Sequence, residues 1–231
     1  MALLLHIDSA VGEACISLAD ADQILAELTH KEQKSHASFL QPAINNILEK
    51  AGKHLSEIDG ISVSAGPGSY TGLRVGLASA KGICFTLNKP LILLNTLEIM
   101  AEKIILAQKN PQDMLYAPMI DARRMEVFTA LYDHQLGQLL APGAYLLDGK
   151  EFVLPFQHRD KQICFFGSGM DKWQEICPRG NYSFLSLPGG SAAQNALAQQ
   201  YYAEKRFADV AYSEPLYFKS FYTTAKIQEG L

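Results

Sequence analysis

The segment from Ser64 to Ala78, SAGPGSYTGLRVGLA, has the residue types and spacing best suited to chemistry. An apolar strand leads into a Gly-Pro-Gly turn, and a helix is predicted to begin directly after it. Glycines allow positive φ and close approach of another group, and free amides at a helix start favour an anion. Gly66, Gly68 and Ser69 are therefore candidate phosphate contacts. The segment lacks the GxxxxGK[ST] pattern of a Walker A loop, and a turn that only packs a helix on a sheet is the alternative.

The helix predicted after this turn carries a stripe of small residues. Residues at three- and four-residue spacing share one helix face, and small side chains there let another helix approach closely. The stripe therefore predicts either packing on the chain's own first helix or docking of a partner helix, and the sequence leaves both open. It consists of Gly72, Gly76, Ser79 or Ala80, and Ile83.

The elements that must position this segment follow a regular order in the first half of the chain. Three short runs joined by tight turns predict an antiparallel meander. The apolar spacing then changes to three and four, which predicts a helix with Leu40 on its apolar face. The predicted strands are 3–9, 14–19, 23–29, 61–64 and 91–94, and the predicted helices are 37–51, one from the glycine motif to about 87, and 96–108.

The second half of the chain repeats this order more faintly. Its first two strands form a hairpin with the basic tip Arg123-Arg124. The order β-β-β-α-β-α, present twice, predicts an α/β fold of two lobes, residues 1–109 and 110–231, with the duplicated architecture of actin-like ATPases. The predicted strands here are 114–121, 126–132, one near 144–147 and 162–166, and a final helix covers 191–205.

Composition narrows the class of protein. The length of 231 residues suits two lobes of about 100 residues each. A net charge of −4 argues against a protein that binds nucleic acid by itself, but not against a subunit whose partner holds RNA. The four cysteines lack CxxC spacing, so neither a zinc site nor a thioredoxin-like pair is predicted. With no signal peptide and no apolar run of ~18 residues, the chain is predicted to be cytoplasmic, without membrane contact.

Several segments together resemble the TsaB/YeaZ family. The glycine motif is similar to that family's hallmark, and MIDARRMEVFTALY is similar to a further stretch typical of it. The resemblance covers nearly the whole chain. It includes LLLHIDSA at the start, SHASFLQPAINNIL around His36, LILLNTLEIMA, and EPLYFKSF near the end, where Lys219 replaces the more usual arginine.

The resemblance implies a role in making threonylcarbamoyladenosine next to the tRNA anticodon. In that system a synthase makes threonylcarbamoyl-AMP and TsaD transfers the group to tRNA. TsaB binds and supports TsaD, and the ATPase TsaE joins them. TsaD carries an HxxxH metal pair where this chain has Thr96 and Met100, neither of which replaces imidazole as a metal ligand. We therefore expect an accessory subunit with no catalytic residues, no metal and no cofactor of its own.

Docking on TsaD, as a heterodimer, is expected to use the first helix and the glycine-motif helix. The same surface would serve a homodimer when TsaD is absent, and tRNA would be met only through the complex. His36 has no histidine partner at i+4, so helix capping or the surface is its expected place rather than a metal site. The expected partner-binding residues are His36, Leu40, Tyr70, Gly72, Arg74, Val75, Gly76, Ser79, Ala80 and Ile83.

ATP or ADP at the partner interface is a further expectation, with candidate contacts added by the resemblance. Asp8 occupies the position of the acid that orients a metal-bound water in actin-like ATPases, although capping a hairpin is its alternative role. Gly167 and Gly169 lie in a turn similar to an adenosine-contact turn. The alternative function is an autonomous actin-like ATPase or small-molecule kinase that would use Asp8 and the loop 66–72.

Overall fold

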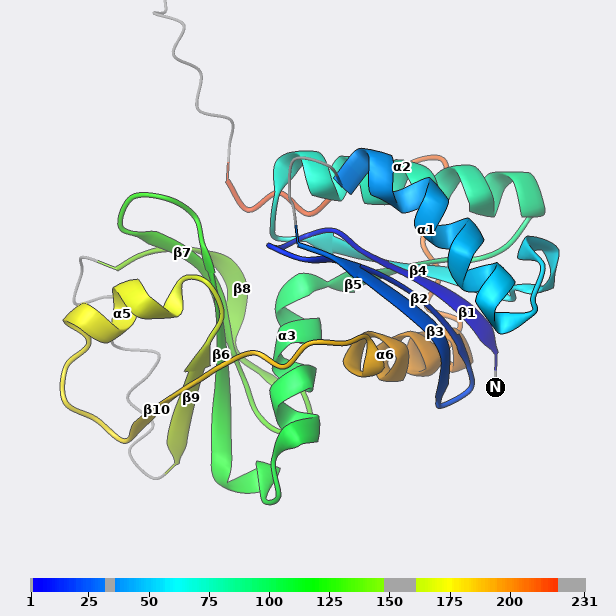
Figure 1. Cartoon of the computed structure of the whole chain (residues 1–231). Helices are drawn as coiled ribbons and strands as arrows, with labels where there is room; N and C mark the ends of the chain where they lie inside the picture. The colour runs from blue at the N-terminus through cyan, green and yellow to red at the C-terminus, as the bar shows by residue number, and fades with distance from the viewer. Residues whose placement is uncertain (1, 32–35, 148–160, 220–231) are drawn as a thin grey trace, which may run out of the picture.

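The parts of the chain that the structure describes form two five-stranded mixed sheets (Figure 1). The computed structural model describes residues 2–31, 36–147 and 161–219, with the backbone alone for residues 36 and 37. The first sheet has the order β3-β2-β1-β4-β5. Its strands are β1 (Leu3–Asp8), β2 (Ala14–Asp20), β3 (Gln23–His30), β4 (Gly60–Gly66) and β5 (Leu91–Asn95).

The second sheet has the same topology as the first. Its order is β10-β9-β6-β7-β8. In each sheet the first three strands pair in antiparallel fashion, and the two later strands continue the sheet in parallel from the first strand. The duplicated two-lobed α/β fold is thereby confirmed. The strands are β6 (Met114–Asp121), β7 (Glu126–Tyr132), β8 (Gln138–Leu146), β9 (Gln162–Phe166) and β10 (Tyr182–Leu185).

Two strands of the second sheet differ from the expectation. β8 begins at Gln138, six residues before the strand expected near 144–147, and β10 was not expected at all. All four residues of β10 are half-buried. A four-residue strand without alternating burial gives no period-2 signal in the sequence, so only pairing with β9 reveals it.

Two helices lie side by side on the first sheet. α1 (His36–Ala51) and α2 (Tyr70–Leu87) lie together on one face of the first sheet (Figure 1). The other helices in the described residues are α3 (Thr96–Ala107), α5 (Met170–Ile176), α6 (Ala192–Ala203) and two 3-10 turns, Leu55–Glu57 and Pro111–Asp113. No helix in the described parts of the chain is long and apolar enough to cross a membrane.

Helices α3 and α6 each pack on the sheet of the other half. α3 follows the first sheet, yet Leu97 and Met100 join a core cluster with Tyr116 of the second sheet. α6 follows the second sheet, yet Leu197 packs with Leu4 of the first sheet. The two helices also contact each other. A division at residue 109 therefore separates the two sheets but not the helices that pack on them.

A buried polar network fixes α6 against the first sheet. His6, on β1, is fully buried, with Nε2 3.1 Å from Asn195 Oδ1 and Nδ1 2.7 Å from Ser62 Oγ. The amide nitrogen of Asn195 donates to the Ala21 carbonyl, so its oxygen must face the ring. Nε2 is then the protonated nitrogen, and the Ser62 hydroxyl donates to Nδ1. Burial lowers the pKa of His6 to about 4 despite the bond to Asn195.

Two glycines of α2 should respond oppositely to alanine. A Cβ at Gly72 would clash with the backbone carbonyl of Ser9, whereas a Cβ at Gly82 would meet nothing within 4 Å. We expect Gly72→Ala to lower the free energy of unfolding by about 1–3 kcal/mol and Gly82→Ala to raise it by up to about 1 kcal/mol. Urea unfolding of both variants measures this. A similar effect of the two substitutions would contradict the packing of α2 described above.

Stability should depend on pH through His6. The folded chain holds the pKa of His6 near 4, below its ordinary 6.5, so the unfolded chain binds the proton more readily. The contribution of neutral His6 is complete above about pH 6.5 and is lost as the pH falls to 4, a change of about 3 kcal/mol. Urea unfolding of the wild type and of His6→Gln between these limits should show a shallower pH dependence for the variant. Equal slopes would contradict the assignment.

Candidate functional site

The glycine motif forms the connection between β4 and α2. Ser69 is the N-cap of α2, and its side-chain oxygen accepts a hydrogen bond from the Gly72 amide at 3.3 Å. The Ser69 amide donates to the Ala10 carbonyl at 2.6 Å, which holds the motif against the β1–β2 turn. α2 ends at Leu87 and is followed by a left-handed C-cap at Asn88, which has a φ of 53° and donates an amide hydrogen bond to the Cys84 carbonyl.

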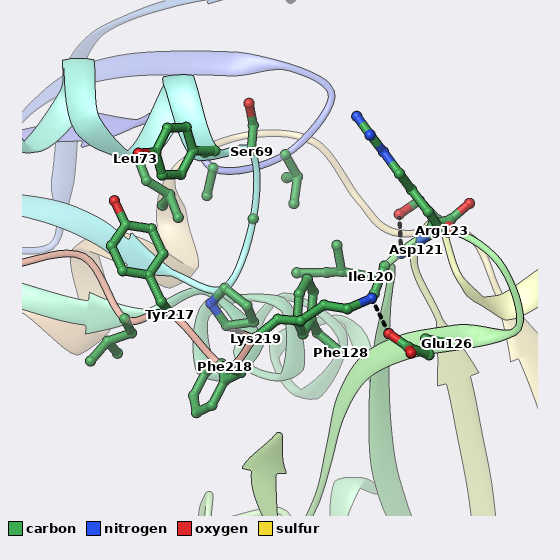
Figure 2. Close-up of a pocket in the computed structure, with 18 of the residues that line it drawn as sticks. Ser69, Leu73, Ile120, Asp121, Arg123, Glu126, Phe128, Tyr217, Phe218 and Lys219 are labelled. Carbon is green, nitrogen blue, oxygen red and sulfur yellow. Dashed lines mark hydrogen bonds and ion pairs between the residues drawn. The ribbon is translucent and has the colours of Figure 1, made fainter. Parts of the chain in front are cut away.

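The motif borders a cleft of about 1050 Å³ between the lobes (Figure 2). The β1–β2 turn and the motif form one wall, and the β6–β7 hairpin forms the other. The C-terminal segment 216–219 also lines the cleft, and Figure 2 shows Lys219 reaching Glu126 of the opposite wall. The cleft is therefore lined by segments that are far apart in sequence.

The candidate nucleotide contacts of the first lobe are only partly brought together. Gly68 and Ser69 line the cleft. Asp8 does not line it: this residue is 6% exposed, and its Oδ1 accepts hydrogen bonds from Ser64 Oγ and the Ala10 amide. Gly66 lies beneath the C-terminal segment, because a Cβ there would lie 2.6 Å from the Leu216 carbonyl oxygen. Asp8 thus stabilises the turn after β1, which is the alternative role expected for it.

The candidate glycines of the second lobe do not line the cleft. A Cβ at Gly169 would lie 2.7 Å from Val127 Cγ1, and Gly167, with φ +100°, packs against Met119 and Met100. Only Ser168, between them, lines the cleft, and its hydroxyl accepts from the Asp121 amide. Both glycines permit close packing of this turn on the second sheet.

The tip of the β6–β7 hairpin has an unusual backbone conformation. Arg123 and Arg124 are both left-handed, with φ of 66° and 51°, as in hairpin turns that favour asparagine and glycine. Lys172 stabilises the turn by donating to Asp121 and to the Arg124 carbonyl. Partial burial opposes ionisation of Asp121, but Lys172 and the Arg123 amide outweigh it and hold the pKa of Asp121 below its ordinary value. Arg123 and Ser69 lie on opposite sides of the cleft (Figure 2).

Four of the expected partner-binding residues are buried within the chain, which corrects that expectation. The small stripe of α2 packs on the chain's own first sheet: a Cβ at Gly76 would lie 2.5 Å from Ser9 Oγ. An arginine at such a position would disrupt the fold, so these residues do not belong to an accessible surface. They are Leu40, Gly72, Gly76 and Ala80.

The other expected partner-binding residues lie at or near the surface. Tyr70 and Arg74 are exposed, and Val75, Ser79 and Ile83 are half-buried. The backbone of His36 begins α1, but its side chain lies outside the described residues. The Arg74 guanidinium lies 3.9 Å from the centre of the Tyr70 ring, and Arg74 Nε donates to Tyr217 Oη at 2.9 Å.

The outer face of α2 contains exposed residues that were not expected from the sequence, among them Ala78, Gly82 and Phe85. Ala78 and Gly82 are four residues apart, and Phe85 is 84% exposed. Ala78 lies about 200° around the helix from Gly76, so the small residues form two stripes on opposite faces. The signal was present in the spacing of Ala78 and Gly82, but spacing alone does not tell which stripe faces the sheet.

The positions aligned with the metal pair lie in the core. Thr96 and Met100 are 1% and 3% exposed in α3. Within residues 2–31, 36–147 and 161–219, no three His, Cys, Asp or Glu side chains are grouped so that they would hold a metal ion. The cysteines at 15, 84 and 164 are buried, and burial raises the pKa of their thiols.

Comparison with known sequences finds a matching family model and several relatives. The family model for TsaD, tRNA N6-adenosine threonylcarbamoyltransferase, matches residues 23–213. The tRNA threonylcarbamoyladenosine biosynthesis protein TsaB of Bacillus subtilis (strain 168) is 31% identical over 71% of this chain and 70% of its own length. TsaB of Escherichia coli (strain K12) is 29% identical over 94% of each chain. A transferase from Zymomonas mobilis matches over only 42% of this chain and 31% of its own.

Comparison with solved structures confirms the fold. YeaZ from Pseudomonas aeruginosa superposes with a TM-score of 0.78 over 94% of this chain and 100% of its own, at 23% identity. A putative N-acetylmannosamine kinase from Listeria monocytogenes superposes with a TM-score of 0.50 over 88% of this chain and 99% of its own, at 11% identity. The sequence relatives and the family model together show that this chain belongs to the TsaB/YeaZ family of tRNA threonylcarbamoyladenosine biosynthesis proteins.

Proposed function

We propose that this chain is a non-catalytic subunit that binds TsaD and supports transfer of the threonylcarbamoyl group from threonylcarbamoyl-AMP to the adenosine next to the tRNA anticodon. TsaE joins the two as the ATPase of the complex, and tRNA is met only through the complex. The complex acts in the cytoplasm, as tRNA modification requires. The names of the TsaB relatives and the match to the TsaD family model support the pathway.

The observation that carries the binding role is the exposed glycine of α2. Gly82 lies inside a helix of 18 residues with open space around its Cβ position. Glycine in a helix interior costs about 1 kcal/mol relative to alanine, and nothing within the described chain approaches closely enough to require it. A partner helix that packs against Ala78 and Gly82 accounts for both small residues, and Phe85 beside them supplies the apolar contact.

The docking surface proposed is therefore the outer face of α2 together with the neighbouring face of α1. It retains Tyr70, Arg74, Val75, Ser79 and Ile83 and adds Ala78, Gly82 and Phe85. The surface of α1 is polar, which suits a complex that forms and dissociates. The same helices would pair with a second copy when TsaD is absent. ATP or ADP at the interface with TsaD stays a prediction.

An autonomous ATPase or small-molecule kinase fits the site less well. Such an enzyme needs a free carboxylate beside the phosphates, whereas Asp8 is bonded to Ser64 and Ala10. It also needs an open phosphate loop, whereas Leu216 covers Gly66. The resemblance to the kinase is one of fold alone. The non-catalytic role is also supported by Thr96 and Met100 at the positions of the metal pair.

Substitution of Gly82 tests the docking surface. Gly82→Arg should leave the isolated chain folded, because the position is open, but should weaken TsaD binding more than about 100-fold by blocking close helix contact. Phe85→Ala should weaken it about 10-fold or more. Titration calorimetry with TsaD measures both. Gly189→Arg is the matched control, since Gly189 is also exposed with open space around it. Unchanged affinity for Gly82→Arg would contradict this surface.

A transfer assay tests the function itself. With threonylcarbamoyl-AMP, tRNA, TsaD and TsaE supplied, modification should require the wild-type chain, and the chain alone should transfer nothing. Gly82→Arg should lose its support of the reaction in proportion to its lost binding, while Gly189→Arg should retain it. Transfer by the chain alone would overturn the non-catalytic assignment, and no effect in any mixture would overturn the role as a subunit.

A further inference from the structure

The C-terminal segment, residues 208–219, runs from the first lobe to the second and is called the strap below. It begins beside β5, where the Ala208 amide donates to the Leu91 carbonyl, and it continues along α2 (Figure 1). Its last four residues enter the cleft between the lobes (Figure 2). The strap therefore touches both the proposed docking helix and both walls of the cleft.

The strap is held firmly by the first lobe. Lys81 of α2 donates to the carbonyls of Ala211 and Ser213 at 3.0 and 2.9 Å. The Leu216 amide donates to the Ala65 carbonyl at 2.7 Å. Gly66, with φ +126°, leaves room for the Leu216 carbonyl. The side chain of any other residue at this position would collide with that carbonyl. The absence of a side chain at Gly66 is thus explained by the strap as well as by the turn.

The strap is held weakly by the second lobe. Lys219 pairs with Glu126 at the start of β7, and side chains of this pair are 39% and 21% exposed. An exposed ion pair of this kind contributes little free energy, and salt screens it. The first-lobe end therefore anchors the strap, and the second-lobe end is the one that opens first.

We propose that the strap is a latch that closes the cleft between the lobes, and that Arg74 links it to the docking surface of α2. Arg74 donates to Tyr217 Oη from the exposed face of α2, and the rings of Tyr70 and Tyr217 lie 5.6 Å apart. A carboxylate of a docked partner would compete with Tyr217 for Arg74. Docking would then loosen the strap at Tyr217, which lies between the Leu216 amide bonded to Ala65 and the ion pair of Lys219 with Glu126. This link rests on the proposed function, whereas the latch rests on the chain's own contacts.

Amide hydrogen exchange of Leu216 in the full chain, followed by NMR, tests the latch. Glu126→Gln should speed exchange of this amide by between about two- and five-fold, because loss of an exposed ion pair frees the strap end. Raising the salt from about 0.05 to 0.5 M should speed it in the wild type but not in the variant. Glu204→Gln, which breaks the exposed pair with Arg206, is the matched control and should change nothing.

One further variant and one further measurement separate the latch from general loss of stability. Reversal of the pair, Lys219→Glu with Glu126→Lys, should restore the wild-type exchange rate. A soluble gadolinium chelate should broaden the amides of Val11 and Gly68, on the cleft wall, more strongly in Glu126→Gln than in the wild type. Unchanged Leu216 exchange in Glu126→Gln overturns the latch, and faster exchange without greater access to the cleft overturns its role in closing it.

The link to the docking surface has its own test. Tyr217→Phe removes the hydroxyl that Arg74 contacts and should speed Leu216 exchange in the isolated chain. Saturating TsaD should do the same in the wild type. TsaD binding without faster exchange overturns the link. Failure of TsaD to bind contradicts the proposed function instead. The exchange and gadolinium measurements on the isolated chain then still test the latch.

Discussion

The close contact between α2 and the end of β1 is the constraint on which the rest of the structure depends. Gly72 and Gly76 bring the helix so near to Ser9 that no side chain fits between them, and the Ser9 hydroxyl donates to the Gly72 carbonyl at 2.8 Å. This contact sets the rotation of α2 about its own axis. Because one stripe of small residues is buried against the first sheet, Ala78, Gly82 and Phe85 face outward.

The same contact fixes one wall of the cleft. Ser69 is held against Ala10 by the first turn of α2, and the turn after β1 is held in place by Asp8. The second wall is positioned by α3 and α6, because each of these helices packs on the sheet of the other half. The walls are thus parts of separate cores joined by two helices, and the ion pair of Lys219 with Glu126 adds a non-covalent link across the cleft.

Three positions singled out by comparison with enzymes of this fold lie within the chain's own structure. Asp8 accepts two hydrogen bonds within its own turn, and Thr96 and Met100 pack in the core of α3. What the chain keeps accessible is a helix surface, and that suits a subunit whose contribution is contact with a partner.

The sequence by itself determined the strands and helices of the first half and their order, and it indicated the duplication. Each strand of the first sheet has a clear apolar run or an apolar–polar alternation, and the glycine motif has a clear helix start at Ser69, so local patterns were sufficient there. The tertiary structure alone decided three things. It decided which stripe of α2 is buried, because helix periodicity is the same for both faces until the contact with Ser9 selects one. It revealed β10, whose four residues form a strand only by pairing with β9. It also brought residues 216–219 to the cleft, because contacts such as Leu216 with Ala65 join positions about 150 residues apart, and no local pattern records such a distance.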